Sequence, residues 1–434
     1  MFRSSGIPQN IKYNNKEAGK YSVPRGTKDI LPDESPFWQG LEEACRKVFE
    51  LYNYREIRTP IFEATELFTR SIGSTTDIVK KEMYEFKDRK GRSLTLRPEE
   101  TAPVVRACLE NNLIESSQTT KLYYIGPMFR YERPQAGRQR QFHQAGVEAF
   151  GSSDPLLDAE IIMLNVQLFN RIGLKGLEVN INSVGCDKCR PEFTKRLKIY
   201  FKNNVKNMCQ DCKARFEYNP LRILDCKEEK CQKYIEEAPA SADTLCGECK
   251  DHFEGAVKAL DYQKVNFKVN KRLVRGLDYY TRTTFEVVSR ELGAQNAVSG
   301  GGRYDTLVQE LGGKPTPAVG FAIGMERVIQ IMTNAKCQMT NEGKIILYIA
   351  TMGEEARKLA FDLLFKVREK GIAADMDYLG KSLKAQMKTA DRIGTERVYI
   401  IGEDEIKKGC GILKNMKTGE QREVPFDSLK EELR

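Results

Sequence analysis

A hairpin pattern in the first third of the chain most constrains what it can fold into. The segment KLYYIGPMFRYE (121–132) reads as a strand, and QFHQAGVEAFG (141–151) reads as the partner strand that returns. Strands joined in this way pair antiparallel. Nearby, PFWQGLEEACRKVFELYNY and TAPVVRACLEN show helical spacing, whereas EIRTPIFE and a hairpin turning at Lys90-Gly91 read as strands. An α+β domain built on an antiparallel sheet is therefore expected.

The loop between the two strands is rich in cations. The stretch FRYERPQAGRQRQFHQ (129–144) contains Arg130, Arg133, Arg138 and Arg140, together with one of the chain's two histidines. The planar fork of arginine suits phosphate oxygens, so the loop indicates a polyanionic partner. The residues alone leave three interpretations open: a nucleotide, a nucleic acid or a solvated loop.

Composition narrows the class of protein. The chain has 434 residues, a formal net charge of +9 and 30% charged residues. This length corresponds to about three domains, and the basic excess is compatible with nucleic acid without requiring it. No run approaches the ~20 apolar residues of a membrane helix. Residues 1–22 lack an apolar core, so we expect a flexible polar leader rather than a secretory signal, and a cytoplasmic protein without membrane contact.

Eight of the twelve cysteines are concentrated in one stretch of shifted composition. They form four close pairs, and the 19 residues between the first two pairs fit the zinc-ribbon spacing of roughly 15 to 20. Two such pairs complete a tetrahedral four-thiolate shell. Reduced thiols suit an unexported chain, and small buried hydrophobic side chains are the alternative. Eight ligands could form two closed structural zinc sites, with the pairing left open: Cys186, Cys189, Cys209, Cys212, Cys226, Cys231, Cys246 and Cys249.

A histidine lies close to this stretch. His252 follows Cys249 by three residues and could replace a ligand, although an ordinary surface histidine is the favoured interpretation.

Two glycine-containing stretches could carry chemistry or be purely structural. GGGRYD (300–305) lacks the pattern of a phosphate loop or a dinucleotide fingerprint, so a tight turn is favoured. RGLDYYTR (275–282) offers a cation, a carboxylate and two tyrosines, with a surface loop as the alternative. Adjacent strand residues face opposite sides, so at most one tyrosine would enter a pocket unless a loop turns both.

Two further stretches place charge at expected helix starts. In LRPEET (96–101), Glu99 could hold a substrate ammonium or simply favour the N-terminus of a helix. In GMERVIQIM (324–332), Arg327 falls in the first turn, where a cation is unfavourable for the helix dipole. This local conflict indicates a function, with a solvated arginine as the alternative.

The C-terminal part has a different texture. After a polar linker (333–344), strands and helices alternate as β-α-β-α-β from IILYIA to RVYIIG. This alternation predicts a small parallel or mixed sheet in a separate α/β domain.

Taken together, these stretches resemble one enzyme family. RTPIFE after a helix, FRYERPQAGRQRQFHQ and GFAIGMERV stand in the order of motifs 1, 2 and 3 of the class II aminoacyl-tRNA synthetases. RGTKDILP, LRPEET and RGLDYYTRT narrow the resemblance to the histidyl-tRNA synthetases. The resemblance covers residues 22–434 and implies a catalytic domain with an insertion and a C-terminal anticodon-binding domain. The implied divisions are 1–22 leader, 23–184 and 261–335 catalytic domain, 185–260 cysteine-rich insertion, and 345–434 anticodon-binding domain.

The resemblance also implies a reaction. L-Histidine would attack the α-phosphate of ATP to give histidyl-adenylate and pyrophosphate, and the 3′ end of tRNA(His) would then take the histidyl group and release AMP. The first attack needs no base, because the carboxylate is already ionised. It needs positioning and charge neutralisation, which arginines and Mg²⁺ supply.

Matching motif positions assign roles to particular residues. Arg130 and Arg275 are the implied catalytic cations on the α-phosphate. The ATP-binding set is Arg130, Glu132, Arg138 and Arg327. The histidine-binding set is Glu99, Thr101 and Gln144 for the α-ammonium, Glu148, Tyr279 and Tyr280 for the imidazole, together with Arg130 and Arg275.

Several neighbouring residues receive no role in ATP or histidine binding. Strand alternation turns His143 away from the site, and Arg133 and Arg140 have no assigned contact with ATP, although Arg133 would face the tRNA acceptor end. Glu100 stands where many family members carry a small residue, which leaves the ammonium pocket's shape open. The insertion would touch the acceptor stem, and motif 1 implies a homodimer.

Two rival functions compete with this interpretation. The synthetase-like regulatory subunit of histidine biosynthesis keeps the fold without catalysis, but it lacks the C-terminal domain and commonly loses motif arginines that are present here. A non-enzymatic nucleic-acid-binding protein with zinc knuckles would explain the charge and the cysteines. It would not explain Glu99, Glu148 and the paired tyrosines.

Overall fold

The computed structural model describes residues 21–73, 76–115, 117–134, 138–289, 296–334 and 345–433. The chain divides into two compact units, one up to residue 339 and one from residue 340. Most of the predicted leader, most of the predicted linker and the middle of the arginine loop (135–137) lie outside the described residues. The finer domain boundaries stay predictions, and each unit is considered by itself.

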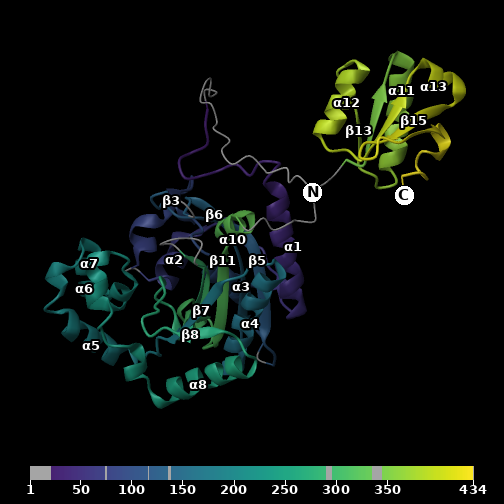
Figure 1. Cartoon of the computed structure of the whole chain (residues 1–434). Helices are drawn as coiled ribbons and strands as arrows, with labels where there is room; N and C mark the ends of the chain where they lie inside the picture. The colour runs from purple at the N-terminus through teal and green to yellow at the C-terminus, as the bar shows by residue number, and fades with distance from the viewer. Residues whose placement is uncertain are drawn as a thin grey trace. The chain divides into compact units, whose positions relative to one another are not determined.

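An eight-stranded sheet forms the centre of the first unit (Figure 1), in the order β1-β5-β6-β11-β10-β9-β7-β8. Neighbouring strands pair antiparallel except β1 with β5 and β7 with β8. The β5–β6 register runs from Thr120 opposite Phe150 to Phe129 opposite Gln141, so the predicted hairpin is confirmed. The strands are β1 (Arg55–Glu56), β5 (Thr120–Phe129), β6 (Gln141–Phe150), β7 (Leu177–Ser183), β8 (Phe267–Val269), β9 (Thr281–Ser289), β10 (Ala297–Arg303) and β11 (Ala318–Gly324).

The tight turn predicted at GGGRYD is wrong. Gly300, Gly301 and Gly302 lie inside β10 and pair with both β9 and β11. The reason for the glycines is space. A Cβ at Gly300 would lie 2.1 Å from Nη2 of Arg275, and one at Gly301 would lie 2.2 Å from the carbonyl oxygen of Gly320. Glycine therefore allows a side chain and a neighbouring strand to approach β10 closely.

Three helices each contribute several buried side chains to an apolar core that they share with the sheet. They are α1 (Ser35–Leu51), α4 (Pro155–Arg171) and α10 (Met325–Asn334). The predicted helix is confirmed as α1, and its buried residues lie on one face at helical spacing. Those residues are Trp38, Leu41, Cys45, Val48 and Phe49.

A smaller sheet, in the order β2-β4-β3, accompanies the large one. Its predicted hairpin is confirmed, since the backbone N–H of Gly91 donates to the carbonyl of Asp88 at 2.9 Å and closes the turn. The predicted helix at TAPVVRACLEN is α3. The elements are β2 (Phe62–Ala64), α2 (Thr65–Ser71), the π-helical turn η1 (Ile78–Glu82), β3 (Tyr84–Lys87), β4 (Ser93–Leu96), α3 (Thr101–Glu110) and α9 (Leu307–Glu310).

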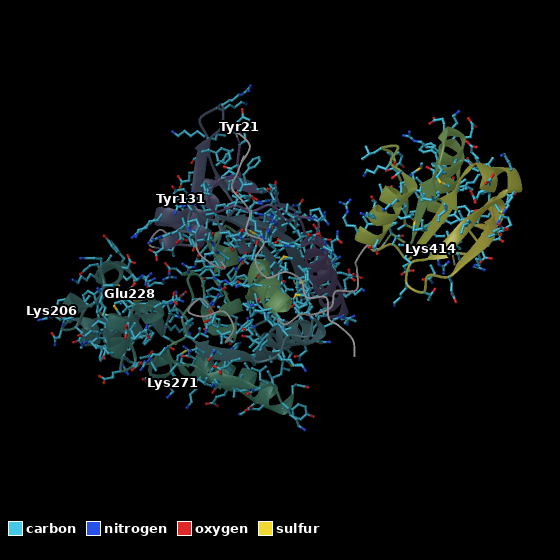
Figure 2. All side chains as sticks on the ribbon, turned by 45° about the horizontal axis from the view of Figure 1, so that its top comes forward. Tyr21, Tyr131, Lys206, Glu228, Lys271 and Lys414 are labelled. Carbon is cyan, nitrogen blue, oxygen red and sulfur yellow. The ribbon has the colours of Figure 1, made fainter. Side chains whose placement is uncertain are left out.

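Between β7 and β8, where the chain is described without a gap, the cysteine-rich stretch contains short helices joined by turns and no strand. Lys206 and Glu228 are among its exposed charged side chains (Figure 2). Its elements are α5 (Arg190–Phe201), η2 (Val205–Asn207), α6 (Gln210–Tyr218), η3 (Pro220–Asp225), α7 (Glu229–Ile235), η4 (Ser241–Thr244) and α8 (Gly247–Tyr262), where η2, η3 and η4 are 3₁₀ turns.

The second unit is built on a five-stranded mixed sheet in the order β13-β12-β14-β15-β16. The first three strands pair parallel and the last two antiparallel, which confirms the predicted mixed sheet. Among the described helices of either unit, none combines the length and the apolar character needed to cross a membrane. The elements are β12 (Leu347–Thr351), α11 (Glu354–Arg368), β13 (Ala374–Met376), α12 (Leu383–Arg392), β14 (Arg397–Ile401), α13 (Glu403–Lys408), β15 (Cys410–Asn415), β16 (Gln421–Pro425) and η6 (Phe426–Ser428).

Candidate active site

A cavity of about 670 Å³ is lined by residues of β5, β6, β9, β10 and β11 together with loops and parts of the insertion. The structure brings together in it every residue that the sequence predicted for ATP or histidine. These are Glu99, Thr101, Arg130, Glu132, Arg138, Gln144, Glu148, Arg275, Tyr279, Tyr280 and Arg327.

Glu148, on β6, is the most buried carboxylate of the cavity. Its Oε1 accepts a hydrogen bond from Oγ1 of Thr101 at 2.7 Å, and its Oε2 accepts one from the hydroxyl of Tyr304. Gly320 on β11 leaves room for this side chain, because a Cβ there would lie 1.9 Å from Oε2. Burial, reinforced by the charge of Glu99, raises the pKa of Glu148 to about 8. A ligand that brings positive charge to this carboxyl would oppose that rise.

Glu99 combines the two interpretations that its sequence left open. Its carboxylate accepts from the backbone N–H groups of Thr101 at 2.7 Å and Ala102 at 3.0 Å, so it caps the N-terminus of α3. The same carboxylate lines the cavity. Burial raises the pKa of Glu99, and the two N–H donors oppose that rise. The helix cap thus holds a buried carboxylate in one position at the cavity surface.

Both tyrosines of RGLDYYTR line the cavity. The chain enters β9 only at Thr281, so Tyr279 and Tyr280 precede the strand and do not alternate as strand residues do. Their ring centroids are 4.9 Å apart. The exception that the sequence allowed, a loop that turns both rings inward, is therefore what the structure contains.

Two arginines of the cavity are held in place by contacts with neighbouring residues. Nε of Arg130 donates to the carbonyl of Pro98 at 2.9 Å, and its guanidinium lies 5.2 Å from the ring centre of Phe142. Nη1 of Arg275 donates to Oε1 of Glu286 at 2.7 Å. These contacts fix each side chain while leaving other guanidinium N–H groups to bind an anion.

Two further arginines of the cavity, Arg138 and Arg327, lie close to one another. Arg138 forms an ion pair with Glu132, with Nη1 3.2 Å from Oε2. Arg327 donates from Nη1 to the carbonyl of Ala297 at 2.6 Å. Burial, followed by the charge of Arg138, lowers the pKa of Arg327. An anion bound between these cations would relieve both effects.

Comparison with known proteins shows to which family this chain belongs. The family model for histidyl-tRNA synthetase matches residues 26–188 and 203–328, and the anticodon-binding-domain model matches residues 346–434. The chain is 53% identical to the histidine–tRNA ligase of Halothermothrix orenii over 411 residues, 95% of this chain and 98% of that protein. This chain belongs to the histidyl-tRNA synthetase family.

Other relatives agree with that assignment. The histidine–tRNA ligase of Desulfitobacterium hafniense is 53% identical over 408 residues, which cover 94% of this chain and 96% of that protein. The crystal structure of apo S. aureus histidyl-tRNA synthetase superposes with a TM-score of 0.80 at 38% identity, covering 95% of this chain and 99% of that one. The class II synthetase fold predicted from the motifs is thereby confirmed.

Two arginines of the family's motif 2 stretch do not line the cavity. Arg140 lies over the ring of Tyr131, 3.9 Å from its centre, and its backbone N–H donates to the carbonyl of Gly26 at 2.7 Å. Arg133 is exposed. Arg140 thus ties the RGTKDILP segment to the arginine loop, whereas Arg133 remains available to an external partner.

His143 faces away from the cavity, as strand alternation predicts. Its Nδ1 lies 3.0 Å from Oε1 of Glu326, and its ring meets that of Trp38 edge-on with centroids 4.8 Å apart. Its neighbour Gln144 lines the cavity instead. The Oε1 atom of Gln144 is buried without a hydrogen-bond partner among the described residues.

The polar residues that line the cavity of this synthetase and that the sequence missed include Glu82, Arg222, Glu286 and Tyr304. Tyr304 belongs to GGGRYD, which the sequence singled out but assigned to a turn. Glu286 follows RGLDYYTR on β9, where its position on the cavity face of the strand was the available signal. Glu82 and Arg222 come from η1 and η3, which only the tertiary fold brings to the cavity.

The eight clustered cysteines gather into two groups of four. One group is Cys186, Cys189, Cys246 and Cys249, and the other is Cys209, Cys212, Cys226 and Cys231. Within each group the sulfur atoms all lie within 4.8 Å of one another. Cys45, Cys108 and Cys410, the described cysteines outside these groups, are single thiols.

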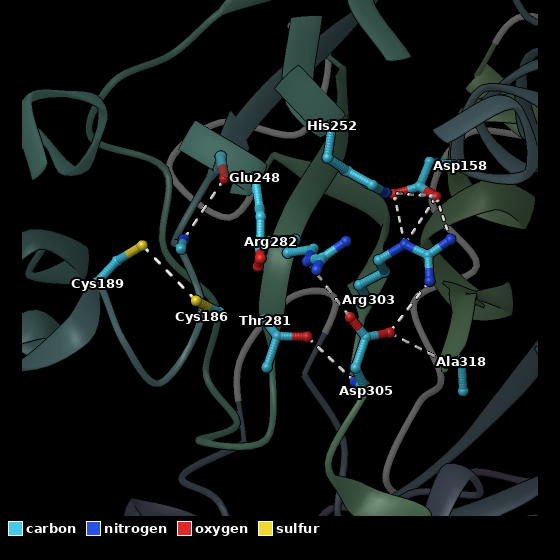
Figure 3. Close-up of polar contacts among 12 residues, drawn as sticks. Asp158, Cys186, Cys189, Glu248, His252, Thr281, Arg282, Arg303, Asp305 and Ala318 are labelled. Atoms are coloured by element: carbon cyan, nitrogen blue, oxygen red, sulfur yellow. Dashed lines mark hydrogen bonds and ion pairs between the residues drawn. The ribbon is translucent and has the colours of Figure 1, made fainter. Parts of the chain in front are cut away.

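His252 is neither a surface histidine nor a member of these groups. It is buried, and its Nε2 lies 3.7 Å from Oδ2 of Asp158, which Nη2 of Arg303 contacts at 2.7 Å (Figure 3). Burial, followed by the charge of Arg303, lowers the pKa of His252 to about 4. The prediction of a surface histidine was wrong, because the face of α8 that carries His252 packs against α4.

Proposed function

We propose that this chain ligates L-histidine to the 3′ end of tRNA(His) through a histidyl-adenylate, with release of AMP and pyrophosphate. The observation that carries the proposal is one cavity that combines buried carboxylates and tyrosines with six arginines, four of which the sequence predicted. The first group suits a cationic amino acid with a donor ring, and the second suits a triphosphate. Membership of the histidyl-tRNA synthetase family supports the same assignment.

Histidine would bind at the carboxylate side. Glu99, Thr101 and Gln144 would receive the α-ammonium group, and the unpartnered Oε1 of Gln144 suits that donor. Glu148, with Tyr279 and Tyr280, would accept from an imidazole N–H. A buried acceptor of this kind rejects side chains that cannot donate there, because they would leave it unpaired.

ATP would bind at the arginine side. Arg130 and Arg275 would act on the α-phosphate, with Arg130 also beside the histidine carboxylate. Glu132 would meet the adenine side, and Arg138 and Arg327 would hold the β- and γ-phosphates. The reaction then needs alignment of the attacking carboxylate and neutralisation of phosphate charge, both of which fixed arginines provide.

Mg²⁺ fits the same part of the cavity. Glu82 and Glu132 both line it, and burial followed by the charge of Glu132 raises the pKa of Glu82. Mg²⁺ is usually bound by one or two carboxylates together with substrate phosphates. When bound, it would supply further neutralisation of phosphate charge.

The remaining partners follow from the same proposal. Arg133 would face the acceptor end of tRNA(His), and the second unit would read its anticodon. A homodimer would form through α1, β1 and the adjoining chain, where Ile61 and Phe62 are exposed apolar side chains. The protein would work in the cytoplasm, where translation takes place.

ATP–pyrophosphate exchange with single amino acids tests the proposal. We expect exchange that depends on L-histidine and falls to background with each of the other standard amino acids. Absence of exchange would favour the non-catalytic rivals, a regulatory subunit or a nucleic-acid-binding protein. Equally strong exchange with another amino acid would show that the imidazole assignment of Glu148 is wrong.

A further inference from the structure

The two cysteine groups have separate places in the insertion. The outer cluster (Cys186, Cys189, Cys246, Cys249) joins the turn after β7 to the start of α8. The inner cluster (Cys209, Cys212, Cys226, Cys231) joins α6, the end of η3 and α7. The inner cluster therefore lies within the loop of chain that the outer cluster closes.

The sulfur–sulfur distances have the size of a tetrahedral metal shell. A Zn–S bond of about 2.3 Å implies sulfur atoms about 3.8 Å apart at the corners of a tetrahedron. The sulfur of Cys186 lies 3.7 Å from that of Cys189 and 3.9 Å from that of Cys246. In the inner cluster, Cys209 and Cys226 are 3.8 Å apart. A disulfide would require about 2.05 Å, so these distances fit ligands of one ion and not covalent pairs.

Backbone groups are arranged to stabilise thiolates in both clusters. The N–H of Cys246 donates to the sulfur of Cys189 at 3.1 Å in the outer cluster. In the inner cluster, the N–H of Cys212 donates to the sulfur of Cys209, and the N–H of Cys209 donates to that of Cys231, both at 3.3 Å. Donors of this kind orient metal ligands and favour their charged form.

Burial alone would fit ordinary core cysteines, but the grouping of the sulfur atoms favours a metal. Cys212, Cys231 and Cys249 are fully buried, yet each stands with three other sulfurs rather than among aliphatic side chains alone. The inner cysteines share an apolar cluster with Ile223, Leu224 and Ile235 of η3 and α7. A metal would add a cross-link between these short helices.

The inner cluster is connected to the proposed histidine site. Cys209 and Cys226 line the cavity, and η3 lies between the two halves of the cluster. From η3, Nη1 of Arg222 donates to the backbone carbonyl of Arg275 at 3.2 Å, and its Nη2 lies 3.7 Å from Oδ2 of Asp77. These contacts hold the loop that carries Arg275.

A second contact holds the same loop, and a further one ties the segment between Cys212 and Cys226 to Asp77. Nδ2 of Asn219, which precedes η3, donates to Oδ1 of Asp278 at 2.7 Å, and Nη2 of Arg215 donates to Oδ2 of Asp77 at 2.9 Å. All three donors, Arg215, Asn219 and Arg222, lie between Cys212 and Cys226. An ion that joins these cysteines would therefore fix the segment that supports Arg275.

We propose that the insertion holds two structural Zn²⁺ ions, one in each cluster, and that the inner ion also positions Arg275 for histidine activation. The two parts differ in what they require. The presence of the two ions is inferred from the geometry of the cysteine clusters alone. The positioning of Arg275 also rests on the proposed function. Four thiolates in a closed shell select zinc or an iron–sulfur cluster, and each cluster offers exactly one tetrahedral set without an open position for chemistry.

Metal content of the purified full-length protein tests the first part. We expect two zinc atoms per chain and a colourless protein, and growth with Co²⁺ should give the absorption bands of tetrahedral cobalt thiolate. Cys231→Ser and Cys249→Ser should each retain one zinc, whereas the control Cys410→Ser should retain two. A zinc-free wild type, a brown protein containing iron, or unchanged zinc in both cluster variants would overturn the two sites.

Kinetics of histidine-dependent exchange test the second part. Neither Cys231 nor Cys249 lines the cavity. We expect Cys231→Ser to lower kcat/KM for histidine by about ten- to a hundredfold, as a misplaced catalytic group does. Cys249→Ser, measured below its lowered melting temperature, should retain exchange close to wild type. Equal exchange in the two variants would overturn the positioning role.

A measurement on the unmodified protein keeps the proposal testable if a variant does not fold. Slow chelation of wild type should release zinc in two phases, and exchange activity should decline with the phase that Cys231→Ser lacks. Activity that declines with neither phase would contradict the positioning role. If wild type contains two zinc atoms but shows no exchange, the metal sites stand and the proposed function fails.

Discussion

The carboxyl group of Glu148 lies in an environment that differs from that of an exposed glutamate. It is buried, it accepts from Thr101 and Tyr304, and its neighbour Glu99 carries the same charge. Such a carboxyl is poised for a ligand that brings N–H donors and positive charge. Its proposed role in selecting histidine can be separated from its role in packing by replacing the carboxyl group with an amide.

Glu148→Gln should keep the shape of the cavity while weakening the contact with the imidazole. Loss of a hydrogen bond to a charged group costs about 1.5–3 kcal/mol, so kcat/KM for histidine should fall by about ten- to a hundredfold. The KM for ATP should change little. Exchange kinetics give both constants, and Glu310→Gln, at an exposed position, serves as the control. Wild-type kinetics in Glu148→Gln would remove this residue from the histidine site.

The pKa of Glu148 also predicts how stability depends on pH. Burial raises this pKa from 4.5 in the unfolded chain to about 8 in the folded chain. The folded state therefore holds a proton that the unfolded state has lost, so the contribution is full below the unfolded pKa and disappears as pH rises through the folded pKa. Without histidine, Tm should fall more steeply between these pH values in wild type than in Glu148→Gln. Parallel curves by calorimetry would contradict the assignment. Burial also raises the pKa of Glu100, so part of the fall of Tm with pH should remain in Glu148→Gln.

At the scale of elements, β10 shows where sequence reasoning fails. Three successive glycines favour a turn by local preference, but the strand needs them because Arg275 and β11 approach its backbone closely. No local pattern contains that information. The β5–β6 hairpin, α1 and α3 were predictable, because alternation and helical spacing are local. The cysteine pairing was not, since it depends on how α6, α7 and α8 return to one another.

Two adjacent glycines of β10 should therefore respond differently to alanine. Gly300→Ala meets mainly the end of the Arg275 side chain, so it should lower kcat/KM for histidine by about tenfold or more with a small change in Tm. Gly301→Ala meets the backbone of Gly320, so it should destabilise the fold by about 1–3 kcal/mol, as overpacking does. Exchange kinetics and thermal denaturation of both variants make the comparison. The same pattern in both would contradict the spatial explanation.

The candidate site illustrates a similar division. Arg130, Arg138, Glu99 and Arg327 stand in motifs whose spacing can be recognised, and all of them line the cavity. Glu82 and Arg222 carry no such pattern, because only the tertiary fold brings η1 and η3 to the cavity. His252 was misjudged for the same reason, since only the packing of α8 against α4 buries it.

At the scale of the whole molecule, the two compact units suggest that histidine activation and tRNA binding can be separated. A chain that ends at residue 334 retains every residue of the cavity. Its histidine-dependent exchange should remain within a few-fold of wild type, whereas charging of tRNA(His) should fall by about tenfold or more, equivalent to about 1.4 kcal/mol of lost tRNA binding. Parallel exchange and charging assays measure both. Equal losses in the two assays would indicate that the second unit supports the cavity itself.

Charging of tRNA(His) with labelled histidine by the full chain tests the central claim most directly. With ATP and Mg²⁺ present, label should accumulate on the tRNA, release AMP in equal amount, and be absent when ATP or the terminal 3′ adenosine is omitted. Arg130→Ala and Arg275→Ala should reduce this charging by orders of magnitude, because both cations are assigned to the α-phosphate. A folded wild-type protein that binds tRNA(His) but transfers no histidine to it would contradict the account.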